Sequence, residues 1–280
     1  MRGFAILLCA CLAIPAAAVR AASLSAELLA GMAAADVVLL GEVHDNPGHH
    51  AVQAAAVAAL RPGAVVWEML GPETAARFRA GWLDDPGHRA QALEWAEAGW
   101  PGFDMYVPIM RAADGAQVYG GLVPRKVATA AMEQGLAAVF GSEAAEYGLM
   151  IPLSGAERAA READQARAHC DALPAEMLPL MVDVQRLRDA VLARAVVAAA
   201  ERQGAEGGGP VVVITGNGHA RTDRGVPEVL ARVRPGLRVF ALGQSEDGAI
   251  EGSFDAVLDS PAPDRPDPCA VFARPAAGSD

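Results

Sequence analysis

Two glutamates and two histidines lie where three apolar runs of the sequence end: Glu42, His44, Glu68 and His219. Carboxylates and imidazoles are ligands for Zn²⁺ or Mn²⁺, and without a metal they act as general acids and bases. Because Glu42 and His44 are two positions apart, an extended backbone would direct both side chains to the same side. These residues predict a site for a divalent metal or for acid–base chemistry.

The apolar runs before these residues have the composition of buried parallel strands. They cover residues 37–41, 65–67 and 211–215 and are rich in valine, leucine and isoleucine. Such strands, joined by helical segments, form parallel sheets whose carboxyl ends all lie along one edge. We call that edge the rim and expect the two glutamates and two histidines to meet there. Each of them, taken singly, is equally consistent with an ordinary strand end, where polar side chains return to solvent.

The rest of the sequence alternates between helical and strand-like segments, without an internal repeat or a linker that would separate two domains. We expect one α/β domain over residues 23–259, with a mostly parallel central sheet flanked by helices. Further strands are predicted at residues 116–122, 237–242 and 254–258, and helices at 23–35 (capped by Ser25), 49–60 and 224–232. Helical insertions are predicted at 72–110 and 154–203, and an extended proline-rich tail at 260–280.

Aromatic residues are concentrated in the first insertion, which carries Trp82, Trp95, Trp100, Phe103 and Tyr106. An irregular aromatic insertion beside a sheet edge would serve as a lid or as the wall of a site for a flat ligand. Aromatic residues at helical spacing are also common in ordinary cores. Both interpretations are compatible with the sequence.

Composition and the N-terminus narrow the class of protein. The chain has 280 residues, 52% hydrophobic composition and a formal net charge of −11, so we expect a folded core and no nucleic-acid partner. Residues 1–22 resemble a signal peptide, with Arg2, an apolar run and small residues before the cleavage site. We therefore expect export to the periplasm. A lipoprotein with peripheral membrane association is the alternative, but cleavage at Cys9 or Cys11 would leave too short an apolar region.

Export would place the two remaining cysteines in an oxidising compartment. Cys170 and Cys269 are an even pair once the signal peptide is removed, so we expect a disulfide between them. No segment carries a G-x-S-x-G nucleophile motif, and Gly216-Asn217-Gly218 lacks the third glycine of a dinucleotide fingerprint. These absences disfavour the serine-hydrolase and dinucleotide-binding classes.

Three further residues, all before His219 in the sequence, are candidates for a site. Arg125 and Arg188 would bind an anion, and Asp189 would orient His219. A solvated helix face or a structural ion pair explains the same residues equally well. The histidines at positions 49, 50 and 88, together with Tyr147, are expected at the surface with no role in a site.

Several short motifs, in this order, resemble the ChaN-like haem-binding uptake family. They are Leu40-Gly41-Glu42-Val43-His44-Asp45-Asn46, Trp67-Glu68-Met69, Pro124-Arg125, Gln185 with Arg188-Asp189, and Gly216-Asn217-Gly218-His219 with Gly225-Val226-Pro227. The similarity spans most of the mature chain. The family belongs to a wider superfamily with Tiki proteases and erythromycin-esterase-like proteins, which share mainly the Gly-Glu-x-His strand end and a late histidine.

The resemblance implies an α/β fold, export or lipid anchoring, and haem binding linked to iron acquisition, with a homodimer as an option. A haem site needs an axial ligand and cations for the propionates. We take Tyr106 as the axial ligand, with Tyr119 and Tyr147 as the other candidates, and assign cofactor contacts to Arg125, Arg188, Asp189 and His219. The wider superfamily suggests a metal-dependent hydrolase instead, in which Glu42, His44, Glu68 and His219 activate water. A module that only binds a small anion is the third option.

Overall fold

The fold is described by a computed structural model that covers residues 24–206 and 208–272. Six strands form one sheet in the order β3-β2-β4-β1-β5-β6, and every neighbouring pair is parallel. The strands are β1 (Val37–Glu42), β2 (Ala64–Trp67), β3 (Gln117–Gly120), β4 (Val211–Gly216), β5 (Val239–Glu246) and β6 (Ala256–Ser260). The predicted α/β class with a parallel central sheet is confirmed. The predicted signal peptide lies outside the described residues.

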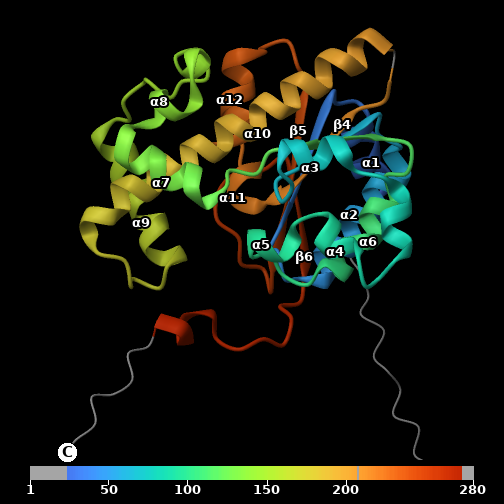
Figure 1. Cartoon of the computed structure of the whole chain (residues 1–280), viewed down its shortest axis with the longest axis horizontal. Coiled ribbons are helices and arrows are strands. Elements are labelled where there is room, and N and C mark those ends of the chain that lie inside the picture. Colours follow the sequence, from blue (N-terminus) through green and yellow to red (C-terminus); the bar gives the residue numbers. More distant parts are fainter. Residues whose placement is uncertain (1–23, 207, 273–280) are drawn as a thin grey trace, which may run out of the picture.

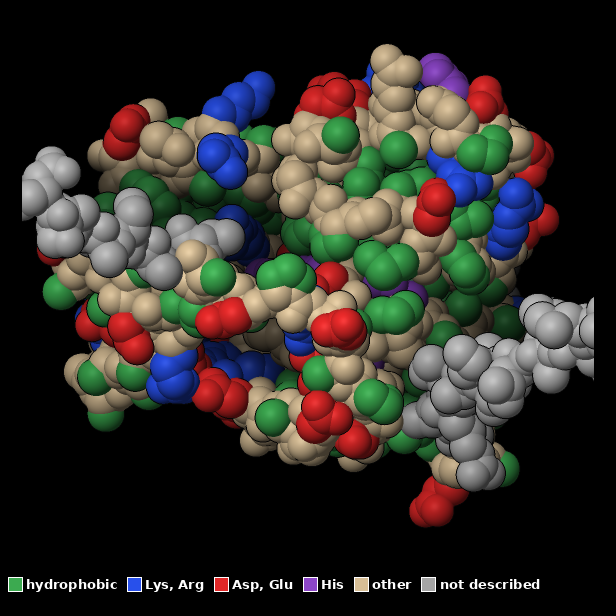
Figure 2. Space-filling view, turned by 90° about the horizontal axis from the view of Figure 1, so that it is seen from below, with side chains coloured by type: hydrophobic (Ala, Val, Ile, Leu, Met, Phe, Trp, Pro, Cys, Tyr) green, Lys and Arg blue, Asp and Glu red, His purple; other side chains and the backbone are tan. Residues whose placement is uncertain are grey.

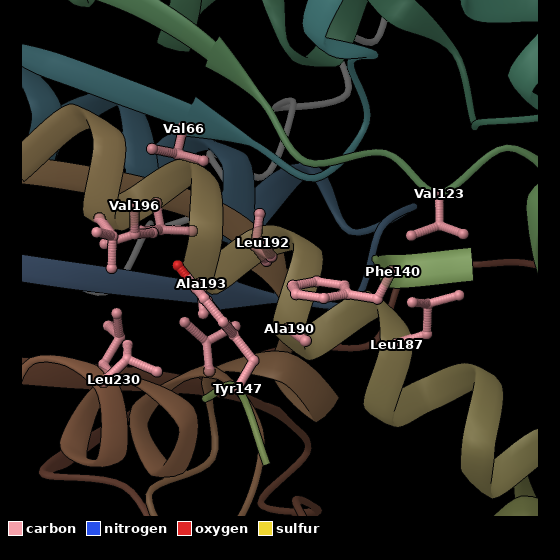
Figure 3. Close-up of a cluster of buried hydrophobic side chains, with 14 of the residues drawn as sticks. Val66, Val123, Phe140, Tyr147, Leu187, Ala190, Leu192, Ala193, Val196 and Leu230 are labelled. Atoms are coloured by element: carbon pink, nitrogen blue, oxygen red, sulfur yellow. The ribbon is translucent and has the colours of Figure 1, made fainter. Parts of the chain in front are cut away.

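The strands read as continuous apolar runs because helices cover both faces of the sheet. Val37 and Leu39 of β1 pack into one core, and Val38 and Leu40 pack into the other. This alternation follows the two-residue repeat of an extended backbone. Figure 3 shows the first core, in which the helix carrying Leu192 packs over the strands. Two buried faces therefore leave solvent access mainly at the strand ends.

Helices enclose the sheet in two groups, which Figure 1 shows on either side of it. The longer ones are α1 (Ala26–Ala33), α2 (Pro47–Leu60), α7 (Arg125–Gln134), α8 (Leu136–Phe140), α9 (Gly155–Ala168), α10 (Leu178–Glu206) and α12 (Val226–Val233). Ser25 caps α1 as predicted, its side chain accepting a hydrogen bond from the amide of Leu28. Among the described residues, no helix is both long and apolar enough to cross a membrane.

The first insertion folds into short helices that pack on the same side of the sheet as α2. They are α3 (Pro72–Arg77), η1 (Ala80–Asp84), α4 (Arg89–Ala92), α5 (Trp95–Ala98), η2 (Phe103–Met105) and α6 (Val107–Ala112). Trp95, Phe103 and Tyr106 are buried in the second core, so the core interpretation holds for these three. Trp100 is only partly buried and reaches the rim. The second insertion supplies α9 and α10.

The C-terminal tail follows β6, the strand that was predicted at residues 254–258 and is observed slightly later. The tail leaves the sheet and passes beneath the molecule toward α9 (Figure 1). Cys170, just after α9, forms the expected disulfide with Cys269. Residues 273–280 lie outside the described part of the chain.

Candidate functional site

The four residues singled out at the strand ends meet at the rim, as predicted. Glu42 ends β1, Glu68 follows β2, and His219 lies in α11 (Asn217–Ala220), which begins directly after β4. These strands are neighbours in the centre of the sheet, in the order β2-β4-β1. The parallel register places Glu42 beside Gly216, so polar groups far apart in sequence share one edge.

Carboxylates and imidazoles alternate along this edge. Glu42 Oε1 lies 2.7 Å from His44 Nδ1, and the Nε2 atom of His44 lies 3.8 Å from Glu68 Oε1. The same Glu68 oxygen lies 3.4 Å from His219 Nε2, and His219 Nδ1 lies 2.6 Å from Asp189. Glu68 therefore stands between two imidazoles, each of which has a second carboxylate behind it. The contact of Asp189 with His219 is the one that an orienting role would need, and that role stays a prediction.

The second carboxylate oxygen of Glu68 fixes the orientation of that side chain. It accepts hydrogen bonds from Thr215 Oγ1 at 2.7 Å and from the amide of Gly216 at 2.8 Å. A side chain at Gly216 would place its Cβ 3.1 Å from His44 Nε2, so glycine leaves room beside this imidazole nitrogen. The anchored carboxylate presents its free oxygen to both histidines.

Charge balance in this cluster shifts its protonation equilibria. Burial alone would lower the pKa of His219, but the adjacent Glu68 and Asp189 raise it to about 10. Burial also opposes ionisation of Glu68, yet the two histidines hold the pKa of that carboxyl well below its usual range. The pKa of His44 is raised by Glu68 and Glu42 despite the opposing effect of burial. Near neutral pH, His219 is therefore a cation next to an ionised Glu68.

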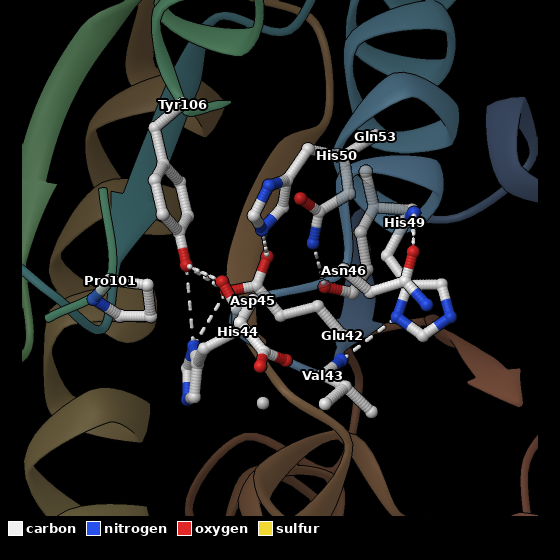
Figure 4. A network of polar contacts seen from close by, with 12 residues as sticks. Glu42, Val43, His44, Asp45, Asn46, His49, His50, Gln53, Pro101 and Tyr106 are labelled. Carbon is white, nitrogen blue, oxygen red and sulfur yellow. Dashed lines mark hydrogen bonds and ion pairs between the residues drawn. The ribbon is translucent and has the colours of Figure 1, made fainter. Parts of the chain in front are cut away.

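Glu42 belongs to a second network, drawn in Figure 4. The hydroxyl of Tyr106 donates to Glu42 Oε1 at 2.7 Å, and His50 Nε2 lies 3.2 Å from Glu42 Oε2. Burial would raise the pKa of Glu42, but its contacts with His44 and His50 lower it to about 2. His49 accepts a hydrogen bond from the amide of Val43 at 2.9 Å, which steadies the backbone before His44.

The surface positions predicted for His49, His50 and Tyr147 are wrong, since all three are buried; His88 is exposed as expected. Asn46 caps α2 by accepting from the amide of Gly48, and Pro47 occupies the first turn, so the helix begins earlier than predicted. Its first turn then packs both histidines under the rim. The Asn-Pro signal for this start was present in the sequence.

The rim opens to solvent mainly at His44. The exposed fraction of the His44 side chain is 28%, against 11% for Glu68, 7% for His219 and none for Glu42. The indole ring of Trp100 lies beside the imidazole, with ring centroids 4.8 Å apart. Figure 2 views this face and shows a hollow with histidine and acidic side chains inside it. The aromatic insertion thus contributes one wall of the opening.

A family model described as "Haem-binding uptake, Tiki superfamily, ChaN" matches residues 28–230, which is most of the chain. The chain belongs to the ChaN family of haem-binding uptake proteins. The matched residues include every rim residue described above, so the family's domain and the polar cluster coincide. No curated protein matches this sequence.

Two solved structures were found to be similar to this ChaN-family chain. A structure titled "Cofacial heme binding to ChaN of Campylobacter jejuni" superposes with a TM-score of 0.61 at 18% identity, covering 82% of this chain and 89% of that one. The type III effector HopBA1 superposes with a TM-score of 0.46 at 13% identity, covering 84% and 91%. The first similarity supports the shared α/β architecture.

The tyrosine that the ChaN resemblance singled out has a structural role here. Tyr106 is fully buried, and its ring packs 4.3 Å from that of His50 and 4.8 Å from that of Trp95. Burial, together with the neighbouring Glu42, raises the pKa of the Tyr106 hydroxyl far above its usual range. In this conformation the hydroxyl is a donor to Glu42 and is closed to an external ligand.

The arginines assigned to cofactor contacts differ from Asp189 in their surroundings. Arg125, the first residue of α7, is exposed, and Arg188 on α10 is half-buried. Neither has an ion-pair partner among residues 24–206 and 208–272. Asp189 is buried behind His219 and contacts that histidine. Gln185 also lies 3.1 Å from His219 Nδ1.

The metal centre predicted from the rim residues is not supported. Within the described part of the chain, no group of three or more His, Cys, Asp or Glu side chains is arranged to hold a metal ion. Glu68 Oε1 lies between His44 Nε2 and His219 Nε2, so these nitrogen atoms are paired with a carboxylate oxygen. The metal-dependent hydrolase loses its structural basis.

A separate pocket lies behind the cluster, between α9, α10 and α12, with a cavity volume of about 180 Å³. Its charged lining residues are Arg161, Arg186, Arg232, Glu157, Glu228 and Asp189. Arg161 already contacts both glutamates, and Arg186 donates to the carbonyls of Gly148 and Ile151. Because the lining charges balance, the pocket offers no net attraction to an anion.

Proposed function

We propose that this chain is an exported haem-binding protein linked to haem uptake, and that it binds haem at the rim. Membership of the ChaN family supports haem as the ligand, and the Campylobacter jejuni ChaN structure is titled for cofacial haem binding. The observation that carries the choice of site is the partly exposed imidazole of His44 beside Trp100. His44 is the residue of the polar cluster whose side chain is most accessible to a ligand.

His44 fits the axial position better than Tyr106. Glu42 holds the Nδ1 side of the imidazole, so Nε2 is the nitrogen left for a ligand; Glu68 Oε1 lies 3.8 Å from it, and Gly216 leaves space beside it. A histidine whose second nitrogen is held by a carboxylate is the usual arrangement for an iron ligand. Bound haem would supply an iron centre with an axial position for this nitrogen. Trp100 would then cover part of the flat porphyrin surface.

Arg125 and Arg188 are suited to the propionates of haem. Both are cations without an ion-pair partner in the described ranges, and both belong to helices on the wall opposite the aromatic insertion. Guanidinium groups bind carboxylates with two parallel hydrogen bonds, which suits this task. The acidic residues at the rim would direct the propionates away from the cluster and toward these helices.

An open rim also suggests how two copies would cooperate. A single rim covers one face of a flat ligand, and the relative's title describes haem groups that face each other. We therefore include a homodimer, formed when two haem-loaded rims meet, in the proposal. The disulfide between Cys170 and Cys269 supports export, because such bonds persist in oxidising compartments.

Haemin titration of the mature protein tests the proposal. We expect a saturable Soret shift that is lost in His44→Ala and retained in Tyr106→Phe. His88→Ala is the matched control, since this exposed histidine lies at the start of α4 and contacts none of the rim residues. A wild-type protein without a saturable shift would refute haem binding. Loss of the shift in Tyr106→Phe but not in His44→Ala would return the ligand role to the tyrosine.

A further inference from the structure

Residues Pro261–Cys269, which we call the strap, connect the sheet to α9 across the face that carries the rim (Figure 1). The near end of the strap is bound to the loop that follows His44. Asn46 donates to the carbonyl of Pro261 at 3.1 Å, and Arg265 forms ion pairs with Asp45 and Glu246. Asp45 follows His44 directly, so the strap attaches beside the most exposed rim residue.

The far end of the strap is covalently fixed. Cys269 is bonded to Cys170 with a Cα–Cα distance of 5.5 Å, within the normal range for a disulfide. Cys170 and Asp171 both have left-handed backbone angles, with φ of 56° and 54°. The amide of Asp171 bonds back to Ala166, a helix ending that ordinarily uses glycine at the left-handed position. A cysteine accepts the strained position here, where it reaches the strap.

Between its two ends the strap has few attachments. Four of its nine positions are proline, which removes backbone donors and favours a stiff extended chain. Most of its residues are exposed, and its other hydrogen bonds within the described ranges are local ones from Cys269 and Ala270 to Asp267. The strap is therefore held at Pro261, at its midpoint Arg265 and at Cys269, with no other attachment to the rest of the molecule within the described ranges.

We propose that the strap is an access barrier over the rim and that the disulfide keeps it in place. The proposal rests on the proposed binding of haem at the rim. A stiff segment fixed on both walls narrows the path to His44, so a ligand enters and leaves slowly while the strap is closed. Breaking the disulfide leaves only the contacts of Pro261 and Arg265 with the rim loop and Glu246, which are weak and reversible.

Stopped-flow haemin binding to the mature protein tests this barrier. In Cys269→Ser we expect association and dissociation rates to rise together by roughly tenfold, because only the partly buried ion pairs of Arg265 and one hydrogen bond to Pro261 then hold the strap. Arg265→Ala should raise both rates less, with the disulfide intact. Arg238→Ala is the matched control, since Arg238 pairs with Asp36 at the opposite end of β1. Unchanged rates, or a faster dissociation alone, would overturn the proposal.

A probe that does not need haem separates the two proposals. Diethyl pyrocarbonate acylates accessible imidazoles, and mass spectrometry reports the rate at His44, with the distant exposed His88 as internal reference. Cys269→Ser should react severalfold faster at His44 and equally at His88. Dithiothreitol should reproduce this effect in the wild type: each cysteine gains one hydrogen as the dithiol closes to its cyclic disulfide. Faster acylation of His44 in a protein that does not bind haemin would refute the proposed function but support the strap as an access barrier. Unchanged acylation of His44 would refute the strap as an access barrier.

Discussion

Replacing Glu68 by glutamine removes the charge that lies between the two imidazoles while keeping the shape of the side chain. Glu68 is the strongest factor that raises the pKa of both His219 and His44. At 3.4 Å, its Coulomb attraction to a protonated His219 is about 5 kcal/mol for an effective dielectric constant near 20. Since about 1.36 kcal/mol corresponds to one pH unit, this is about 3.6 pH units, and we expect the pKa of His219 to fall from about 10 to between about 6 and 6.5.

The sign of the stability change follows from the same numbers. Because the folded-state pKa of His219 is raised from 6.5 to about 10, its protonation stabilises the fold fully below pH 6.5, and this stabilisation is lost as the pH rises to about 10. In Glu68→Gln the folded-state pKa of His219 would lie close to the unfolded value of 6.5, so this stabilisation would be absent. The free energy of unfolding of the wild type, measured in urea, should fall between pH 7 and pH 10. In the variant, the contribution of His219 to this free energy should not change with pH.

NMR titration of ¹³C-labelled histidines measures the pKa values directly. Thr215→Val is the matched control, because it removes the hydroxyl that donates to Glu68 and leaves the charge in place. We expect a large fall for His219 and a fall for His44 in Glu68→Gln, and only small changes in the control. An unchanged His219 titration in Glu68→Gln, or an equal change in both variants, would contradict the central role of the shared carboxylate.

Two further outcomes concern stability. Cys269→Ser should lower the free energy of unfolding by about 2–5 kcal/mol in urea titrations, because the disulfide closes a loop across a sequence separation of 99 residues; Cys170→Ser should match it, and the double variant should lose nothing more. The folded-state pKa of Glu42 is lowered from 4.5 to about 2, so its ionisation should contribute about 3 kcal/mol above pH 4.5 that disappears as the pH falls to about 2. Glu42→Gln should abolish this part of the acid dependence, and an acid profile identical to that of the wild type would argue against a buried, ionised Glu42.

The parallel sheet and the gathering of the strand-end residues were predictable from local composition. Apolar runs before Glu42 and Glu68 indicated buried strands, and parallel connection then placed their ends together. The even cysteine count led to the disulfide. The end of β5 was missed because Gln244 and Ser245 are polar; the structure buries them by bonding Gln244 to the carbonyl of Gly41 and Ser245 to Asp259.

The network around Glu42 was not predictable in the same way. Tyr106 reaches it from an insertion 64 positions further along the chain, and nothing in local composition indicates that approach. His50 lies in an alanine-rich helix whose sequence shows little amphipathic contrast, so the face that turns toward the sheet is not evident. Burial of these polar groups depends on tertiary contacts with one carboxylate. Sequence patterns predict helices and strands well, but they predict such tertiary contacts between polar side chains poorly.

The polar cluster is mounted on β2, β4 and β1, which are flanked on both sides by other strands of the sheet. Central strands of this kind exchange their amide hydrogens only in rare, extensive openings, whereas outer strands and tethered loops open far more often. Motions of the outer strands and loops that let a ligand enter therefore leave the distances between the carboxylates and imidazoles unchanged. The site residues are thus carried by rigid central strands, and the loops and outer strands around them are free to move.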